Sequence, residues 1–563
     1  MRAIVQRIRT VPAWYWLGLG LAAVYVCGLF PDVMDVDASQ YASIAMEMLQ
    51  NGHWLQVQHR HADYLDKPPL LFWTSAFSFA LFGLHNWAYK LPSLLGALAG
   101  VYAVYRFCLL FYTRETARLA AFILASCTGV LLLCNDVRTD TLLMGMTACA
   151  VWLLASPRPF GGLGGACIGL AMLAKGPIGL IVPVFAIGAH ILLHRNWRAI
   201  FQWRWLASLA VAGVLLLPMC WGLYQQFDLH PEKAVNHRTG VSGLYFYFWE
   251  QSFGRITGEN AWKNDTSPFY FLHVYLWAFL PWPLLLAGAL WGRVKALYRS
   301  GWRLNAGDEG YSLGAFVLTF IALSLSKYKL PHYIFVTLPW AAVLTARWLT
   351  TSAPAAPWRY AQYVVYGILG IAVCLILGFV FPTAHLLKWG IPLGLLGTVA
   401  WQMIRQRAAP APDGIVRSGV LVFLAVAFVL NVHFYPSLLP YQSTATAARY
   451  ANQSGIPPEK RAFYNRHGHA LDFYSGAILA GLKTPADIRQ KSTQSGAFWL
   501  YTDAPGRARL DSAGVRYSQT AAFQHFQVAL LQPAFLNPGQ PPAIHAAGLS
   551  VKNSGRTKAA GLK

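Results

Sequence analysis

The chain has 563 residues, of which 56% are hydrophobic and only 12% carry a charge, and its mean hydropathy is +0.39. This composition excludes an ordinary soluble globular protein and indicates an integral membrane protein. The net charge of +23 needs no nucleic-acid partner, because basic loops facing anionic membrane lipids explain much of it.

Apolar runs separated by polar breaks predict the transmembrane helices. A bilayer core about 30 Å thick needs roughly 20 apolar residues per helix. About thirteen runs approach this length. Their approximate spans are 13–31, 87–111, 116–134, 139–155, 161–175, 176–194, 205–226, 269–292, 311–326, 331–349, 361–381, 384–404 and 416–436.

The start of the chain, MRAIVQRIRT, is basic and carries no small-residue cleavage signature, so we expect a retained first helix and a cytoplasmic N-terminus. Counted from there, the cytoplasmic loops are rich in arginine, in agreement with the positive-inside rule. Residues 1–436 then form a transmembrane domain with periplasmic loops at 32–86 and 227–268. Residues 437–563 are predicted to form a periplasmic domain.

The C-terminal region mixes strand-like pieces such as GAFWLYTD with helical ones such as YQSTATAARYANQSG. This mixture predicts a small α/β domain, and the final SVKNSGRTKAAGLK is expected to be disordered. The predicted fold class is therefore an all-α polytopic membrane protein with a small C-terminal α/β domain.

The first periplasmic loop opens on DVMDVDASQYASIAMEML, with three aspartates in six residues. Apolar residues after Asp37 follow the helical i, i+3, i+4 pattern and predict an amphipathic helix that lies flat on the membrane. Asp37 and Gln40 then match a capping box. The spacing alone leaves two interpretations of Asp37 open, a helix cap or a functional carboxylate.

Other charged residues fall on the same predicted membrane face. They are Lys67 in YLDKPPLLFW, Asp140 in NDVRTDTLL, Lys175 in LAKGPIG, and Lys327 and Lys329 in SKYKLPHYIF. Taken singly, the aspartate fits a helix cap and the lysines fit side chains that reach to head groups. Together they indicate a site, because ionisable groups in a membrane bundle are costly and usually functional. Carboxylates suit proton abstraction, lysines suit a phosphate leaving group, and a sugar linked to a lipid phosphate needs both.

The motifs DVDASQYASIAMEML, YLDKPPLLFW, YKLPSLLGAL, VRTDTLLM, LAKGPIGL and SKYKLPHYI occur in an order that resembles one family. It is the family of polyprenyl-phosphate-dependent glycosyltransferases of the GT-C fold. The chain is most similar to the bacterial branch that contains the lipid A aminoarabinose transferases, which is related to the protein O-mannosyltransferases. The resemblance covers about the first 350 residues, and the set of motifs is specific although each one alone is weak.

The resemblance implies roles for individual residues. The family's catalytic aspartate at the start of the first periplasmic loop matches Asp37, and a second acidic site matches Asp140. The lysine at the donor phosphate matches Lys67, and the tyrosine three residues earlier matches Tyr64. Further candidate ligands of the donor phosphate are Lys175, Lys327 and Tyr333.

Two departures from the family pattern affect the substrate. The chain has Ala38 after the catalytic aspartate where the family usually has glutamate, and Asp66 where the family has glutamate before the lysine. Asp35 is a candidate to replace the missing carboxylate, with Asp66 as a second supporting residue. The identity of the sugar is therefore left open.

The stretch HRHAD makes His59 and His61 weak candidates for a metal site, with interfacial hydrogen bonding as the alternative. No cofactor is required by the sequence, and a divalent metal stays open.

The sequence thus predicts a bacterial inner-membrane glycosyltransferase with its active site on the periplasmic face. The donor is expected to be a polyprenyl-phosphate sugar, and the acceptor lipid A or another envelope glycan, with membrane lipids as further partners. A protein O-mannosyltransferase and a non-catalytic flippase of lipid-linked sugars remain alternatives. A flippase needs access from both faces, whereas the charged residues gather on one.

Overall fold

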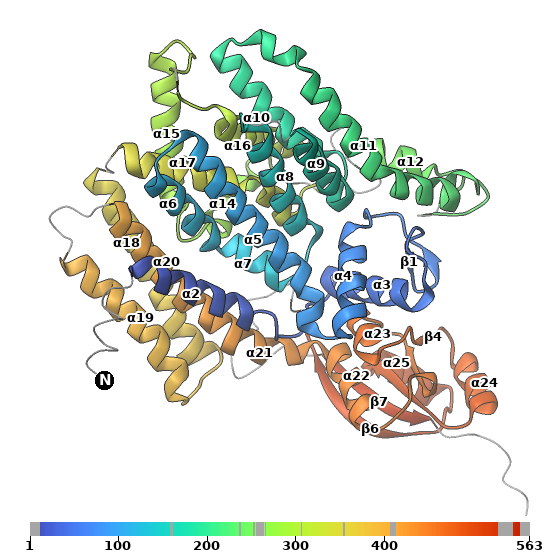
Figure 1. Ribbon diagram of the computed structural model, residues 1–563. Coiled ribbons are helices and arrows are strands. Elements are labelled where there is room, and N and C mark those ends of the chain that lie inside the picture. The colour runs from blue at the N-terminus through green and yellow to red at the C-terminus, as the bar shows by residue number, and fades with distance from the viewer. Residues whose placement is uncertain are drawn as a thin grey trace, which may run out of the picture.

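The computed structural model describes residues 12–157, 161–235, 238–251, 254, 264, 266–305, 307–352, 355–405, 412–526, 528 and 544–551. A large body of helices carries a smaller unit built on a β-sheet at one end (Figure 1). This arrangement confirms the predicted combination of a mostly helical protein with a small α/β unit. The tail predicted to be disordered begins at Ser550; its first two residues belong instead to the last strand of the sheet, and the rest lies outside the described residues.

The helical body contains the following elements. They are α2 (Ala13–Cys27), α3 (Asp37–Asn51), α4 (Leu70–Phe82), α5 (Asn86–Phe111), α6 (Arg114–Ala125), α7 (Thr128–Asn135), α8 (Thr139–Ala155), α9 (Gly161–Lys175), α10 (Ile178–His194), α11 (Trp203–Leu223), α12 (Gly243–Tyr245), α14 (Tyr270–Ala278), α15 (Pro283–Arg299), α16 (Tyr311–Ser324), α17 (Leu338–Thr351), α18 (Ala356–Leu375), α19 (Leu386–Arg405), α20 (Pro412–Val429) and α21 (Tyr435–Leu438).

Each predicted apolar run falls on one or two of these helices. By length and apolar composition, five helices of the described chain suffice to cross a membrane, and six if the bent pair α6 and α7 is counted as one span. That pair bends by 49°, and six further apolar helices have only 10–17 residues. The structure thus supports a multi-pass membrane protein, whereas the number of thirteen spans remains a prediction.

Glycine and proline residues mark where helices end within the apolar stretches, which the length of an apolar run alone does not show. Gly176, with φ of 88°, ends α9 directly after Lys175, and Pro177 precedes α10. The predicted run 269–292 is split into α14 and α15 around Pro281. Proline lacks the backbone N–H that helix continuation requires.

The first loop is packed between two parts of the protein. It contains α3, the hairpin of β1 (Gln58–His59) and β2 (Ala62–Asp63), and the start of α4. Helix α3 lies against α4 on one side and α23 of the sheet unit on another (Figure 1). Ser43 and Glu47 are therefore buried together with the apolar residues. The predicted helix is confirmed, and both its apolar and its polar residues pack against protein. Its position on the membrane surface stays a prediction.

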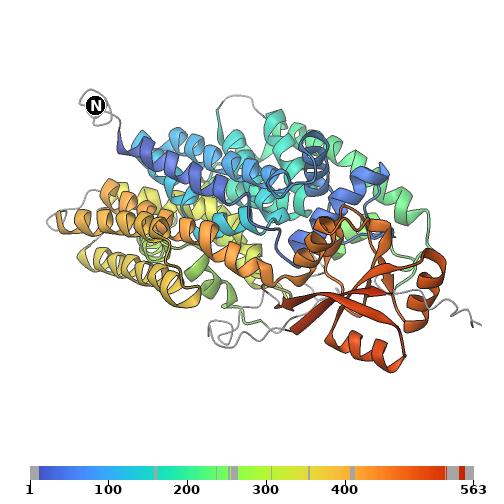
Figure 2. The same cartoon turned by 90° about the horizontal axis from the view of Figure 1, so that it is seen from below.

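The sheet unit comprises α22 (Ser443–Gln453), β3 (Arg461–Tyr464), α23 (His469–Ser475), β4 (Ala480–Leu482), α24 (Pro485–Ser495), β5 (Phe498–Asp503), α25 (Ala504–Ser512), β6 (Tyr517–His525) and β7 (Ile544–Val551). The strand order is β4-β3-β5-β7-β6, in which β3 is parallel to β4 and β5, and β7 is antiparallel to β5 and β6. Figure 2 shows the sheet beside the first loop, at the end of the helical body.

Polar contacts fix the sheet unit to the first loop. Arg449 pairs with Asp32, and Arg60 pairs with the fully buried Asp472. The Tyr474 hydroxyl accepts the Val33 N–H at 2.9 Å and donates to Asn86 at 2.8 Å. The segment that carries Asp37 is therefore held from both sides.

Candidate active site

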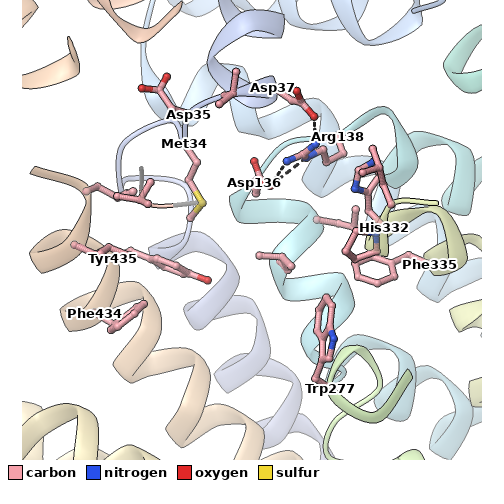
Figure 3. A pocket seen from close by; sticks show the side chains of 18 residues that line it. Met34, Asp35, Asp37, Asp136, Arg138, Trp277, His332, Phe335, Phe434 and Tyr435 are labelled. Carbon is pink, nitrogen blue, oxygen red and sulfur yellow. Dashed lines mark hydrogen bonds and ion pairs between the residues drawn. The ribbon is translucent and has the colours of Figure 1, made fainter. Parts of the chain in front are cut away.

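A cavity of about 560 Å³ lies below the start of α3, where the first loop, the α7–α8 connection and α21 meet (Figure 3). Its charged and polar lining comes from Asp35, Asp37, Asp136, Arg138 and His332. Its apolar lining comes from Met34, Val36, Leu132, Leu133, Trp277, Leu330, Pro331, Phe335, Phe434, Tyr435, Leu438, Leu439 and Val528. A few polar groups in an apolar wall suit a ligand with a polar head and an apolar body.

Asp37 is held by Arg138 at the upper edge of this cavity. One guanidinium nitrogen of Arg138 donates to the Asp37 carboxylate, and two others donate to Asp136 at 2.8 and 3.0 Å (Figure 3). Burial raises the pKa of Asp136, and the Arg138 charge counteracts this. The Asp37 side chain is 38% exposed, against 17% for Asp136. Asp37 is thus the more accessible carboxylate of the pair.

The structure contradicts the capping box at Asp37. Helix α3 begins at Asp37, its N-cap residue is Val36, and no side chain caps this end. The Asp37 carboxylate is engaged by Arg138 instead of by the backbone of its own helix. The interpretation of Asp37 as a helix cap is therefore wrong.

Asp140 and Lys175 form a second, buried ion pair. The Lys175 ammonium donates to Asp140 and lies 4.1 Å from the ring centre of Tyr333. The Asp140 side chain is 1% exposed, and His332 Nε2 lies 3.9 Å from its other oxygen. Asp140 lies in the first turn of α8 without capping it. Since His332 also lines the cavity, the two ion pairs belong to one region.

Asp35 takes a different role from the one expected. Its carboxylate accepts hydrogen bonds from Ser39 at 2.5 Å and from Thr444 of α22 at 3.1 Å, and its N–H donates to Gln442. Figure 3 shows it turned away from Arg138. Burial raises the pKa of Asp35, against the effect of these hydrogen bonds. Asp35 therefore joins the first loop to the sheet unit, and this contact does not support its use as a second catalytic carboxylate.

Tyr64 is buried in the first loop, with its ring against Phe72 of α4. Burial raises the pKa of Tyr64, and the charges of Asp66 and Asp37 raise it further. The Lys67 ammonium lies 3.4 Å from the Asp66 carbonyl oxygen, and the same oxygen accepts a hydrogen bond from Gln251. Asp66 thus contacts the 227–268 segment through Gln251, and neither Asp66 nor Lys67 is among the residues that line the cavity.

The segment with Lys327 and Lys329 lies beside Asn264. The Asn264 side chain accepts the Lys329 N–H at 3.0 Å and donates to its carbonyl oxygen at 2.7 Å. Lys329 is 4% exposed, and its ammonium donates to the Thr266 carbonyl oxygen at 3.1 Å. Lys327 is exposed, and its carbonyl oxygen accepts the Asn264 N–H. These contacts bury the Lys329 side chain, whereas the Lys327 side chain is exposed.

The candidate metal residues point to different partners. His61 lies 3.0 Å from the buried Glu47, whose carboxylate also accepts the N–H groups of Arg60 and His61 at 2.7 Å each. The His59 ring instead packs against His469 of α23 at 4.8 Å. In the described part of the chain, no group of three or more His, Cys, Asp or Glu side chains is arranged to hold a metal.

The contact between His59 and His469 joins the first loop to the sheet unit, and it predicts that the stability of this interface depends on pH. Burial, followed by the charge of Arg60, lowers the pKa of His59 to about 4, and burial lowers that of His469 to about 3. Below pH 6.5 these histidines bind protons in the unfolded chain but not in the folded protein, so the free energy of unfolding decreases as the pH falls from 6.5 towards 4. Each histidine lowers it by about 1.4 kcal/mol per pH unit over this range.

Thermal unfolding of the purified protein between pH 7.5 and 5 measures this effect. The His469→Asn variant should show a shallower pH dependence than the unchanged protein. Equal slopes for the two proteins would contradict the assignment.

Three residues of the site were not selected from the sequence, namely Arg138, Asp136 and His332. Arg138 and Asp136 lie in the same NDVRTDTLL stretch as Asp140. Their position between two predicted spans could have identified them as site residues, because charged residues are costly in a membrane and usually functional. His332 carried no signal of its own, because its position follows from the turn over Pro331–Thr337.

Comparisons with known proteins show which sequences and folds the chain resembles. The sequence profile of the dolichyl-phosphate-mannose-protein mannosyltransferases matches residues 66–223. An undecaprenyl phosphate-alpha-4-amino-4-deoxy-L-arabinose arabinosyl transferase from Sodalis glossinidius is 28% identical over 450 residues, which are 74% of this chain and 76% of that protein. The transferase of the same name from Enterobacter sp. is 25% identical over 531 residues, covering 86% and 90% of the two chains.

Crystal structures of ArnT from Cupriavidus metallidurans have the same fold. The form bound to undecaprenyl phosphate superposes with a TM-score of 0.73 at 17% identity, over 95% of this chain and 98% of that one. The apo form gives 0.72 at 18% identity with the same coverage. The chain is therefore similar in sequence to the aminoarabinose transferases named above, and it shares the fold of ArnT.

Proposed function

We propose that the protein is a membrane glycosyltransferase that moves a sugar from a polyprenyl-phosphate donor to a periplasmic envelope acceptor such as lipid A. The observation that carries the proposal is the accessible Asp37 carboxylate, fixed by Arg138 at the edge of a largely apolar cavity. The named relatives that transfer aminoarabinose from undecaprenyl phosphate support the same donor class.

Asp37 acts on the acceptor in this proposal. An acceptor hydroxyl gives its proton to the Asp37 carboxylate, its oxygen bonds to the anomeric carbon, and the bond from that carbon to the phosphate oxygen breaks. Attack from the face opposite the phosphate inverts the anomeric centre. For an acceptor that is already a phosphate, no deprotonation is needed and Asp37 orients it. Arg138 fixes the direction of the carboxylate in both cases.

The lysines act on the donor. Cations opposite a leaving phosphate stabilise the charge that develops as the sugar departs. Lys67 and Lys175 are the proposed ligands of this phosphate, with Lys327 and Tyr333 beside them. The pair with Asp140 and the Tyr333 ring hold the Lys175 ammonium in place. Polyprenyl phosphate is then the second product.

Mass spectrometry of envelope glycans from a deletion strain tests the proposed acceptor. We expect a sugar on lipid A, or on another envelope glycan, to be lost and to return with the gene. Loss of a sugar from proteins alone would favour the protein O-mannosyltransferase alternative. The mannosyltransferase profile that matches residues 66–223 is consistent with that alternative.

Lys67→Ala is expected to weaken donor binding about tenfold or more and acceptor binding much less. The substitution removes a charged partner of the phosphate, and hydrogen bonds to charged groups are worth roughly 1.5–3 kcal/mol. Binding of a polyprenyl-phosphate sugar to purified protein measures the effect. Lys233→Ala, which removes an outer-loop lysine paired with Asp63, is the matched control and should bind donor normally. An equal loss of donor and acceptor binding would argue against the assignment.

The region after residue 437 is proposed to lie in the periplasm, together with the first loop to which it is bound. An alkaline phosphatase fusion at Gly455 should be active, and a reporter that works only in the cytoplasm should be silent there. The reverse pattern would place Asp37 on the wrong face for a periplasmic acceptor. Gly455 lies in an open turn after α22, so the fusion should not disturb the fold.

A further inference from the structure

A second charged pocket lies at the opposite end of the helical body. Helices α15 and α17 run to the end away from the sheet unit (Figure 1). Between their C-terminal halves is a pocket of about 120 Å³. Its lining consists of Ala289, Gly292, Arg293, Ala296, Leu344, Arg347, Trp348, Thr351 and Ser352. None of these residues belongs to the candidate active site.

Two nearly buried arginines line this pocket. The Arg293 side chain is 9% exposed and that of Arg347 is 16% exposed. In the part of the chain that the structure describes, Arg293 Nε and Arg347 Nη1 are buried and have no hydrogen-bond partner. A buried N–H of a charged group without a partner is costly, so both groups have unused capacity for an anion.

The acidic residues nearby do not accept hydrogen bonds from these two N–H groups. Asp308 is shared, at 2.7 Å from Arg347 Nη2 and 3.7 Å from Arg293 Nη1. The Glu309 carboxylate accepts hydrogen bonds from Tyr112 and Ser312. Arg293 donates to the backbone carbonyl oxygen of Glu309 and not to its carboxylate. The pocket side of the two guanidinium groups therefore faces no carboxylate among the residues that line it.

The size and the walls of the pocket restrict its ligand. Pockets for drug-sized ligands measure roughly 300–1,000 Å³, so this one accepts only a small group. Trp348 forms a firm wall, because its ring packs so closely on α15 that a Cβ at Gly288 would lie 2.7 Å from it. On α15 itself, Trp291 and Tyr298 are 68% and 73% exposed. Exposed aromatic residues of this kind are typical of the membrane interface.

We propose that this pocket binds the phosphate of an anionic membrane lipid. Arginine suits phosphate because its planar group donates two parallel hydrogen bonds, and basic pockets between helices on the cytoplasmic side bind anionic head groups. The exposed aromatic residues beside the pocket indicate that the phosphate arrives on a lipid. In the proposed topology this face is cytoplasmic, whereas sugar transfer takes place on the other side of the membrane.

Native mass spectrometry of protein released from nanodiscs of mixed phosphatidylglycerol and phosphatidylethanolamine tests the proposal. The unchanged protein should retain phosphatidylglycerol in preference to phosphatidylethanolamine. Ala296→Trp fills the pocket while both arginines are kept and should reduce this retention about tenfold, whereas Ala287→Trp, on the exposed side of the same helix, should not. Equal retention in the Ala296→Trp and Ala287→Trp variants would overturn the proposal.

A second comparison separates the charge from the lipid. Arg347→Gln should also lower phosphatidylglycerol retention about tenfold, because it removes a charge-assisted hydrogen bond. If this variant does not fold, Arg347→Lys, which keeps the charge but loses the paired geometry, should give a smaller loss. Inorganic phosphate at millimolar concentration should displace little of the lipid. Complete displacement by inorganic phosphate, or no preference over phosphatidylethanolamine, would overturn the lipid assignment.

Discussion

Asp37→Asn is expected to reduce sugar transfer by about 10²- to 10⁴-fold, the usual contribution of a positioned acid–base group. Asn has nearly the same shape as Asp, the Asp37 side chain does not cap α3, and Arg138 keeps its ion pair with Asp136, so the fold should survive the loss of the Asp37 charge. The amide lacks the second carboxylate oxygen that would receive the acceptor proton. Donor binding should persist, because the proposed phosphate ligands are lysines.

Transfer and donor binding should be measured on the same purified variant. Asp413→Asn, which changes a carboxylate paired with Arg118 and Arg417, is the matched control and should leave transfer unchanged. Near-normal transfer by Asp37→Asn would remove the base from the proposed chemistry. The result would then favour an acceptor that is already a phosphate, for which Asp37 has only an orienting role.

Lys175→Met is expected to destabilise the protein by about 3–5 kcal/mol, because it leaves the Asp140 carboxylate without its charged partner. The Asp140 side chain is 1% exposed, and the nearby His332 ring, at 3.9 Å, carries a charge only when it is protonated. Unpaired charges in such surroundings are among the most costly single changes. Thermal or denaturant unfolding in detergent measures the loss.

A second substitution in the same chain distinguishes the ion pair from other roles of Lys175. Asp140→Asn combined with Lys175→Met should recover much of the stability while sugar transfer stays low, since the proposed phosphate ligand is still missing. Full recovery of transfer in the double variant would show that Lys175 serves the fold alone. No loss of stability in the single variant would show that the pair is not buried in the membrane protein.

The helical layout was largely predictable, because apolar runs are the strongest signal that a membrane chain carries. Run length did not show the 49° bend between α6 and α7 or the break at Pro281, since a kink changes direction without changing composition. The number of spans therefore does not follow from the runs. The mostly helical architecture and the small sheet unit were predicted correctly.

The candidate site was predictable only in part. The motif order indicated Asp37, Asp140 and Lys175, and the structure places the last two in one ion pair. The contacts of Asp35 and of α3 with the sheet unit were not predicted, for a shared reason. Their partners, Thr444 and α23, lie about 400 residues further along the chain, and local spacing carries no information about such contacts.

Reconstituted sugar transfer is the decisive measurement of the proposed reaction. Purified protein in liposomes receives an undecaprenyl-phosphate sugar, with lipid A as acceptor. We expect sugar to appear on the acceptor, polyprenyl phosphate to be released in equal amount, and Asp37→Asn to stop both. Movement of the intact donor across the bilayer without cleavage, or transfer from a nucleotide sugar with no lipid donor present, would contradict the proposed reaction.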